Sequence, residues 1–361
     1  MNDANELISF IASMSGEGNL RVEENLGEGY VRLRVSEAER RQAKHDIQHV
    51  EDIVIEMLRN ARDAGADKVY LATTKEDGVR TLVFLDNGSG VPQDMQERIF
   101  DARVTSKLES MKMDHWGVHG RGMALFSIKQ NTDEARVVAS DVDLGSVFKV
   151  SVATDRLGER ADQSSWPQAV KDEDGHYVCA RGPHNIIRAA CEFALEELRA
   201  CDVYLGSPSE IAATLHAQAS SRLDASRLLF IDDEAELPVV DRLGLASDAE
   251  DFIRICSGLG LEMSERTAHR ILAGQIKPVR GVTARLLRER DSSSHASAPV
   301  DLAKDRRGLR IAKDDMAQFS RAVERDFNDL AARYYLNLCG DPKIRVSRDR
   351  ITVTFDLAKE E

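Results

Sequence analysis

The sequence EMLRNARDAGA at residues 56–66 is the most informative part of this chain when it is taken together with two later segments. The first of these is DNGSGVP at residues 86–92, and the second is GVHGRGMAL at residues 117–125. Each segment alone is common, because many helices and turns carry similar residues. The three occur in this order within residues 56–125, and the combination is far more specific than any one of them.

Composition describes a folded, acidic chain of 361 residues, long enough for two or three domains. Hydrophobic residues make up 42%, which allows a sizeable core and argues against wholesale disorder. The net charge of −13 excludes a nucleic-acid platform over the whole surface, although a local basic element remains compatible with it. The five dispersed cysteines form no CxxC pair and predict reduced thiols in a cytoplasmic protein. No segment has the pattern of a signal peptide or a membrane span, so no membrane association is expected.

Hydrophobic periodicity predicts a helix over residues 49–64, with apolar residues at steps of three and four. Glu56 and Asn60 are four residues apart and therefore project from one face of this helix, beside the apolar stripe. A strand that follows leads directly into Asp86. The order of elements predicts an α+β domain with a mixed sheet and helices on one face. The expected strands cover residues 68–73, 80–85, 136–140 and 147–152, and a loop at 103–119 precedes a helix at 122–129.

The three segments resemble the N, G1 and G2 boxes of the GHKL ATPases, the superfamily of gyrase, the heat-shock chaperone ATPases, histidine kinases and MutL. The resemblance covers about residues 45–155. It is nearest to MutL and topoisomerase VI B subunits at residues 56–66 and at Thr105-Ser106-Lys107. Two positions depart from the usual pattern, with Met123 in place of the MutL glutamate and Ser146 where threonine is commoner. The resemblance implies a Bergerat-type α/β sandwich that binds ATP with Mg²⁺.

The same resemblance implies roles for individual residues. Asp86 would accept a hydrogen bond from the adenine amine with support from Ser146, while Gly88 and Gly90 would let the backbone approach the base. Glu56 would activate the attacking water, and Asn60 would be a ligand of Mg²⁺. The sequence has no GxxxxGK[ST] pattern, so a P-loop is excluded as the ATP site, and it has no strand–GxGxxG–helix unit that would support a Rossmann cofactor site. The other residues expected at the ATP site are Asp63, Val91, Thr105, Ser106, Lys107, Gly117, His119, Gly120, Arg121, Gly122, Met123 and Ala124, and the segment between Lys107 and Gly117 would be the lid.

The chain divides into four expected regions. Residues 1–155 would form the ATP-binding domain, which starts with a hairpin near Gly27-Glu28-Gly29 and a helix capped by Ser36 and Glu39. Residues 156–245 would form an α/β middle region of transducer-like type. The two remaining regions are a helical module with a linker at 246–300, and a long helix over 314–338 followed by a β-hairpin at 344–355, together covering 301–361.

The helices expected within residues 248–290 resemble a repressor-type helix-turn-helix. The segment from Leu259 to Arg290 is rich in Lys and Arg, as a local DNA contact requires. Arg266, Thr267 and Arg270 are the candidates for contact with DNA, because they lie at the start of the expected recognition helix. The alternative is a solvated basic helix pair that packs on the ATP-binding domain.

The sequence therefore predicts an ATPase whose cycle closes the lid and changes conformation or dimerisation. This cycle would be coupled to DNA or to a protein partner, and an ATP-dependent homodimer is one expected form. Two alternatives remain open: an ATP-sensing DNA-binding regulator with little hydrolysis, and a histidine-kinase-like or anti-sigma-type signalling protein. Against the second, His45 and His49 are too close to Asn60 to belong to a separate dimerisation hairpin.

Overall fold

The computed structural model describes residues 22–106, 112–114, 117–119, 122–160, 162–223 and 233–287, with shorter pieces between 316 and 359. Its backbone separates into two compact units, Met1–Asp291 and Ser292–Glu361. In the part of the chain that is described, no helix is long and apolar enough to cross a membrane.

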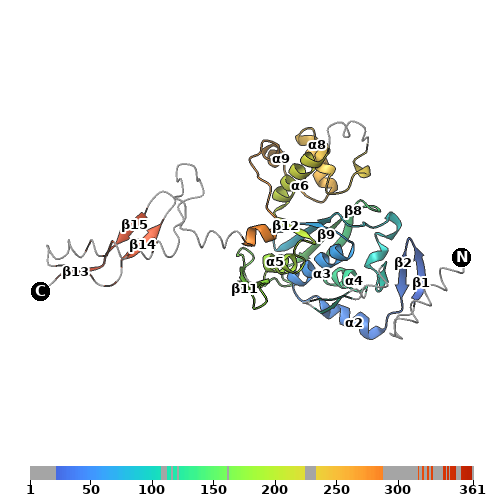
Figure 1. Ribbon diagram of the computed structural model, residues 1–361, viewed down its shortest axis with the longest axis horizontal. Coiled ribbons are helices and arrows are strands. Elements are labelled where there is room, and N and C mark those ends of the chain that lie inside the picture. The colour runs from blue at the N-terminus through green and yellow to red at the C-terminus, as the bar shows by residue number, and fades with distance from the viewer. Residues whose placement is uncertain are drawn as a thin grey trace. The chain divides into compact units, whose positions relative to one another are not determined.

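A five-stranded mixed sheet forms the centre of the first unit (Figure 1). Four strands are antiparallel neighbours, and the fifth, β12, adds to the edge of β3 in parallel. The sheet therefore takes one edge strand from beyond residue 155. In spatial order the strands are β12 (Asp202–Gly206), β3 (Lys68–Glu76), β4 (Val79–Asp86), β9 (Ser146–Ala153) and β8 (Glu134–Ser140).

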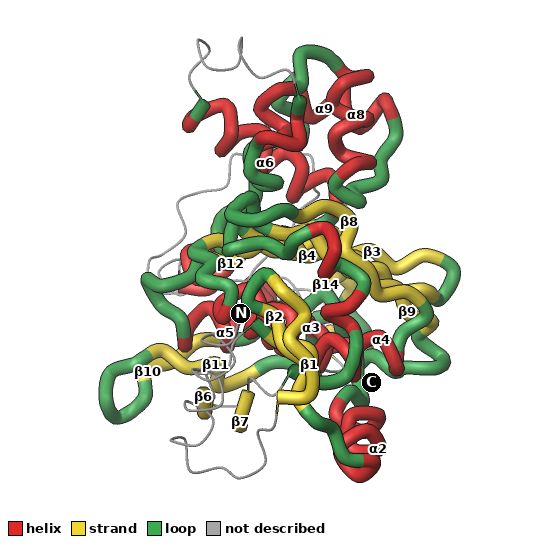
Figure 2. The backbone as a smooth tube through the Cα atoms, turned by 90° about the vertical axis from the view of Figure 1, so that its right-hand side faces the viewer, coloured by secondary structure: helices red, strands yellow, loops and turns green. Residues whose placement is uncertain are grey.

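Helices cover both faces of this sheet (Figure 2). Successive strand residues point to opposite faces, so Leu71 and Phe84 lie in one core while Tyr70 and Leu85 lie in the other. The first layer contains α3 (Val50–Asp63), α4 (Ala124–Asn131) and α5 (Ile186–Glu196). The second layer contains α6 (Pro208–Arg222), α8 (Ala249–Gly258) and α9 (Glu265–Leu272). The α+β fold with a mixed sheet is confirmed, and the second helical layer makes the sheet the middle of three layers.

Helix α3 positions the first motif as its periodicity predicts. The Asp52 carboxylate accepts a hydrogen bond from the His49 N–H at 2.8 Å where the helix begins. Gly65 follows the helix with a φ of +75°, a conformation that suits glycine. The apolar stripe is buried, and Glu56 and Asn60 are half-buried on the adjacent face.

Smaller elements surround the first layer. The predicted hairpin and the predicted capping box of Ser36 and Glu39 are both confirmed. The segment expected as a loop at 103–119 contains three short strands, because its backbone pairs with itself and with the hairpin. These elements are β1 (Val22–Gly27), β2 (Tyr30–Leu33), α2 (Glu37–Asp46), η1 (Gln93–Met95), η2 (Arg98–Phe100), β5 (Val104–Thr105), β6 (Lys112–Asp114) and β7 (Gly117–His119).

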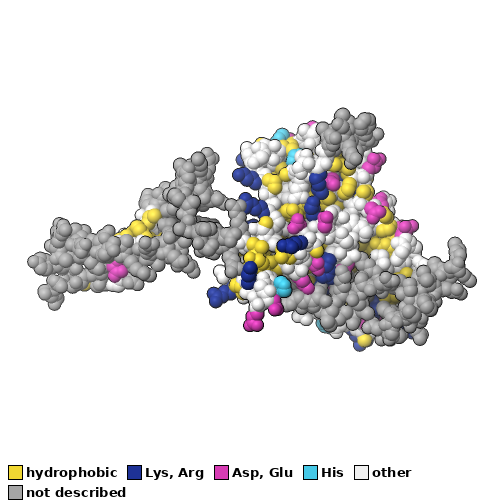
Figure 3. Space-filling view, in the orientation of Figure 1, with side chains coloured by type: hydrophobic (Ala, Val, Ile, Leu, Met, Phe, Trp, Pro, Cys, Tyr) yellow, Lys and Arg dark blue, Asp and Glu magenta, His cyan; other side chains and the backbone are white. Residues whose placement is uncertain are grey.

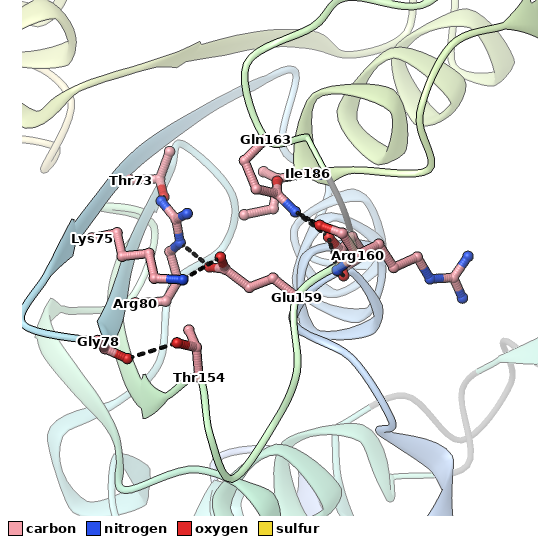
Figure 4. Close-up of polar contacts among 10 residues, drawn as sticks. Thr73, Lys75, Gly78, Arg80, Thr154, Glu159, Arg160, Gln163 and Ile186 are labelled. Carbon is pink, nitrogen blue, oxygen red and sulfur yellow. Dashed lines mark hydrogen bonds and ion pairs between the residues drawn. The ribbon is translucent and has the colours of Figure 1, made fainter.

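A cluster of ionic and polar contacts fastens the segment after β9 (Figure 4). The Glu159 carboxylate accepts hydrogen bonds from Lys75 at 2.9 Å and from Arg80, whose guanidinium also donates to the Thr73 hydroxyl. The neighbouring Gln163 amide donates to Glu51 on α3. The segment is thereby tied to β3, β4 and α3. The elements that follow it are the hairpin β10 (Gln168–Lys171) and β11 (Tyr177–Arg181), and later η3 (Glu234–Glu236), η4 (Arg242–Leu245) and a helix at 282–287.

The second unit contains two antiparallel strand pairs. β14 (Lys343–Val346) pairs with β15 (Ile351–Thr354), which confirms the predicted hairpin. β13 (Leu336–Leu338) pairs with β16 (Leu357–Lys359), so the helix predicted over 314–338 is wrong at its C-terminal end. Residues 336–338 are a strand because they pair with β16, about twenty residues later. Helical periodicity contains no information about such a distant partner. The predicted linker at 291–299 lies outside the described residues.

Candidate functional site

A cavity of about 460 Å³ lies between α3, the end of β4 and the start of α4. Residues predicted from widely separated parts of the sequence line this one space. They come from α3, from the turn after β4, from β5, from the start of α4 and from β9. The predicted residues in the lining are Glu56, Asn60, Asp63, Asp86, Gly90, Val91, Thr105, Ser106, Gly122, Met123, Ala124 and Ser146.

The remaining predicted residues are not among the described lining. Gly88 is buried beneath the turn that follows β4. Gly117 and His119 are the ends of β7, whose pairing with β6 is all that is described there. Lys107, Gly120 and Arg121 lie outside the described residues.

A buried carboxylate closes one end of the cavity. Asp86 ends β4 and is 3% exposed, and strand pairing places it directly opposite Ser146 on β9. The Ser146 hydroxyl donates to one carboxylate oxygen at 2.5 Å, and the Gly88 N–H donates to the other at 2.8 Å. Hydrogen bonds from two sides therefore fix the direction of this carboxylate.

The glycines after Asp86 lie close to other parts of the chain's own backbone. A Cβ on Gly88 would lie 2.8 Å from the Ala64 carbonyl oxygen, and one on Gly90 would lie 1.8 Å from that of Asp141. The close approach is thus to the chain's own backbone. The two glycines let the turn after β4 pack between the end of α3 and the β8–β9 turn.

The wall formed by α3 carries the predicted glutamate and asparagine. The Arg59 guanidinium donates to the Glu56 carboxylate at 2.8 Å and is itself 4% exposed, so it orients the glutamate. The amide nitrogen of Asn60 is buried and has no hydrogen-bond partner. The Asp63 carboxylate accepts from Arg62 at 3.1 Å, which makes an ion pair at this corner.

Backbone donors come from the start of α4, which also lines the cavity. Gly122 has a φ of +66°, and α4 begins two residues later without a side-chain cap. An uncapped helix start presents free N–H groups and a partial positive charge, which favour an anion. The Ser127 hydroxyl, on the first turn of α4, is 1% exposed, lines the cavity and has no partner.

Residues that the motifs did not indicate also line the cavity, and several of them come from the elements before the first motif or from the start of β5. Tyr30 comes from β2, Glu39 and Gln42 come from α2, and Arg103 precedes β5. Burial raises the pKa of Tyr30, although a hydrogen bond with Ser106 acts in the opposite direction. The capping box correctly predicted the residue at which α2 begins. No local sequence signal, however, indicates that α2 packs beside α4 and so brings Glu39 and Gln42 to the cavity.

The donor set fits a triphosphate nucleotide with one Mg²⁺. In the described part of the chain, no group of three or more His, Cys, Asp or Glu could hold a metal ion, so a site made wholly by such side chains is not formed there. Mg²⁺ keeps several waters and often takes only one or two protein oxygens besides phosphate oxygens. The Asn60 amide can present its oxygen without breaking a hydrogen bond of its nitrogen.

The α8–α9 pair has a buried turn and an exposed basic face. Gly260 in the turn lies against Val83 and Val138 of the sheet. Arg266, His269 and Arg270 are exposed together on α9, whereas the Thr267 hydroxyl is hydrogen-bonded to Ser264 at 3.0 Å. Figure 3 shows Lys and Arg side chains on the α9 side of the helical layer. The exposed face thus contains two of the three predicted DNA contacts.

Comparison with known proteins agrees with this geometry over part of the chain. A family model described as histidine kinase-, DNA gyrase B- and HSP90-like ATPase matches residues 47–140. DNA mismatch repair proteins MutL of Staphylococcus aureus strains Newman, JH1 and N315 are each 35% identical over 98 residues. The similarity covers 27% of this chain and spans only 14% of the length of those relatives. Residues 47–140 thus match the model of the GHKL ATPases and have weak similarity to MutL, which confirms the resemblance seen in the motifs.

Proposed function

We propose, from the match of residues 47–140 to the model of the GHKL ATPases, that this protein binds ATP with Mg²⁺ in the cavity and hydrolyses it. One observation supports the proposal above all: a single cavity joins a buried carboxylate, a catalytic-type carboxylate and a helix N-terminus. The three are Asp86, Glu56 and the start of α4 at Gly122. These are the groups that an adenine amine, an attacking water and a phosphate chain respectively need.

Binding would begin with Asp86. Its carboxylate accepts a hydrogen bond from the exocyclic amine of adenine, while Ser146 and the Gly88 N–H keep it aimed. Because those two donors already fix the carboxylate before the ligand binds, binding costs little further side-chain entropy. The backbone N–H groups at the start of α4 would take the phosphate oxygens.

Hydrolysis would use Glu56 as general base. The carboxylate accepts a proton from water as the water oxygen attacks the γ-phosphorus, and the bond from that phosphorus to its bridging oxygen breaks to give ADP and phosphate. Arg59 positions the carboxylate for this step. Mg²⁺, held in part by the Asn60 oxygen, would supply neutralisation of phosphate charge when bound.

The cycle is proposed to close the segment between Lys107 and Gly117 and to change conformation or dimerisation. The cycle would be coupled to binding of DNA or of a protein partner. The exposed basic face of α9 is the candidate surface for DNA. A second candidate function is a DNA-binding regulator that senses ATP with little hydrolysis. Two hydrogen bonds favour it: Asp143 N–H to the Ser89 oxygen, and Val239 N–H to the Leu144 oxygen, both at 2.8 Å, connect the Asp86 turn with the helical layer.

The test compares the wild-type protein with Glu56→Gln and Asp86→Asn by ATP affinity and by phosphate release. We expect Glu56→Gln to bind ATP normally and to lose about 100-fold or more of the turnover, which is the contribution typical of a general base. Asp86→Asn should lose affinity for both ATP and adenosine. Unchanged ATP binding in Asp86→Asn would refute the site assignment.

The same proteins separate the two candidate functions. Wild-type protein that binds ATP without turnover would favour the sensor. DNA binding gated by a non-hydrolysable ATP analogue and retained in Glu56→Gln would point the same way. Phosphate release that is stimulated by DNA and abolished in Glu56→Gln would favour the ATPase cycle.

A further inference from the structure

Arg103 is the cavity residue whose features the proposed mechanism does not explain. Its side chain is 7% exposed, it lines the cavity, and its Nε is buried without a hydrogen-bond partner. Its φ of +62° is left-handed, a conformation that is unfavourable for an L residue. Backbone strain of this kind, together with an unsatisfied buried side-chain donor, is characteristic of a functional site.

Two backbone hydrogen bonds hold Arg103 at the Gly122 end of the cavity. The Arg103 N–H donates to the Gly122 oxygen at 2.9 Å, and the Arg103 oxygen accepts from the Leu33 N–H at 3.0 Å. The residue is therefore clamped between β2 and the glycine that precedes α4. Arg103 and the residues at the start of α4, where phosphate oxygens are expected, line the same cavity.

The guanidinium is paired with the Glu39 carboxylate of α2. The other oxygen of Glu39 accepts from the Ser36 N–H at 2.8 Å and from the Ser36 hydroxyl at 3.0 Å, which caps the helix. The Ser36 N–H, the Ser36 hydroxyl and Arg103 lower the pKa of Glu39 although partial burial opposes them, so the carboxylate is ionised at neutral pH. One Glu39 oxygen thus accepts from Ser36 at the start of α2, and the other accepts from Arg103.

The two partners differ in their access to water. The Glu39 side chain is 38% exposed, so water can replace Arg103 as its partner at little cost. Arg103 is buried, and a buried guanidinium left without an anion is strongly destabilised. Any anion that enters the cavity and competes for the guanidinium therefore displaces Glu39 rather than leaving Arg103 unpaired.

We propose that Arg103 is a phosphate-contact residue of this cavity, and that Glu39 occupies it until a nucleotide with a polyphosphate chain takes its place. The inference rests on the proposed ATP site. A guanidinium can donate two parallel hydrogen bonds to two oxygens of a phosphate. Only one Glu39 oxygen is paired with Arg103, because the other accepts from Ser36. Among the described residues that line the cavity, Arg59 is the other cation, and it is engaged with Glu56 on the α3 wall. Among the described lining residues, Arg103 is thus the positively charged group near Gly122.

The experiment uses four full-length proteins: wild type, Arg103→Gln, Glu39→Gln and the control Glu37→Gln. Glu37 is also on α2 but is exposed and faces Arg41, so its variant removes the same charge without touching Arg103. Affinities for Mg·ATP and for adenosine are measured by titration calorimetry. Adenosine has no phosphate and therefore reports the Asp86 end alone.

We expect Arg103→Gln to weaken ATP binding by about 10- to 100-fold, the range for a charge-assisted hydrogen bond, and to leave adenosine binding unchanged. Glu39→Gln should strengthen ATP binding, because it removes the competing carboxylate, while Glu37→Gln should behave as wild type. Wild-type affinity for ATP in Arg103→Gln would overturn the inference. Weaker ATP binding in Glu39→Gln would also overturn it, since the pair would then be a scaffold.

Folding is checked by circular dichroism before each titration. If Arg103→Gln does not fold, Glu39→Gln decides: stronger ATP binding supports the inference and unchanged binding overturns it. Wild-type protein that binds neither ATP nor adenosine would overturn the proposed function as well. Wild-type binding of both ligands with no effect of Arg103→Gln would overturn only the role of Arg103.

Discussion

The hydroxyl of Ser146 donates a 2.5 Å hydrogen bond to the carboxylate of Asp86, sixty residues earlier in the chain. Antiparallel pairing of β4 with β9 sets the two residues opposite each other at the buried end of the cavity. The register of the sheet therefore fixes the direction in which the Asp86 carboxylate points. The proposed recognition of adenine depends on that direction.

The first prediction concerns this pair. Ser146→Ala should lower the free energy of unfolding by about 1–3 kcal/mol, because a buried carboxylate loses a hydrogen-bond donor. It should also weaken binding of adenosine and ATP alike. Ser146→Thr keeps the hydroxyl and is the matched control. Urea unfolding and calorimetric titration give the two readouts, and equal behaviour of the Ala and Thr variants would contradict the prediction.

The second prediction concerns the turn after β4. Gly90→Ala should destabilise the protein more than Gly78→Ala does. Both glycines have positive φ, but a Cβ on Gly78 meets nothing within 4 Å, whereas one on Gly90 overlaps the Asp141 oxygen. Gly78→Ala therefore measures the backbone strain alone, about 1–2 kcal/mol, and overpacking should add about 1–3 kcal/mol at Gly90. Equal unfolding free energies of the two variants would show that the turn can open.

The third prediction concerns the dependence of stability on pH. Burial raises the pKa of Glu159, but hydrogen bonds from Arg80 and Lys75 outweigh it, and the net pKa is lowered from 4.5. A carboxyl group whose pKa falls on folding stabilises the protein above its unfolded pKa, and this stabilisation is lost as the pH drops through the folded pKa. Wild type should therefore be more stable than Glu159→Gln at pH 7, and the difference should shrink as the pH falls below 4.5.

Chemical unfolding at a series of pH values measures that difference. Glu134→Gln is the control, because it removes an ion pair with Arg136 in which both side chains are largely exposed. Such a pair contributes little, so this variant should follow wild type closely. A constant gap between wild type and Glu159→Gln across the acidic range would contradict the assignment.

The fourth prediction concerns the exposed face of α9. If this face binds DNA, the double variant Arg266→Gln, Arg270→Gln should weaken binding and reduce the slope of log K against log salt by about 1–2. Arg254→Gln on α8 is the control, because Arg254 is exposed but paired with Glu234 at 2.6 Å. Fluorescence anisotropy with duplex DNA at several salt concentrations is the measurement. An unchanged slope in the double variant would exclude this face.

Much of the fold and site could be predicted where the cause is local. The periodicity of α3, the glycine that follows it and the strand that ends at Asp86 are read within one turn or one strand. The C-terminal hairpin was predicted for the same reason. The helix predicted up to Leu338 was wrong at its end, because β13 obtains its conformation from pairing with β16.

The motifs and the capping residues predict part of the cavity wall and the starts of helices, because spacing and capping act over a few residues. Three-dimensional packing sets the parallel addition of β12 to the sheet and the cover of its second face by α6, α8 and α9. It also decided that Glu39 meets Arg103, 64 residues further along the chain, at the edge of the cavity. Such contacts depend on how separate elements pack. The spacing of residues within one element does not predict which distant elements will pack against it.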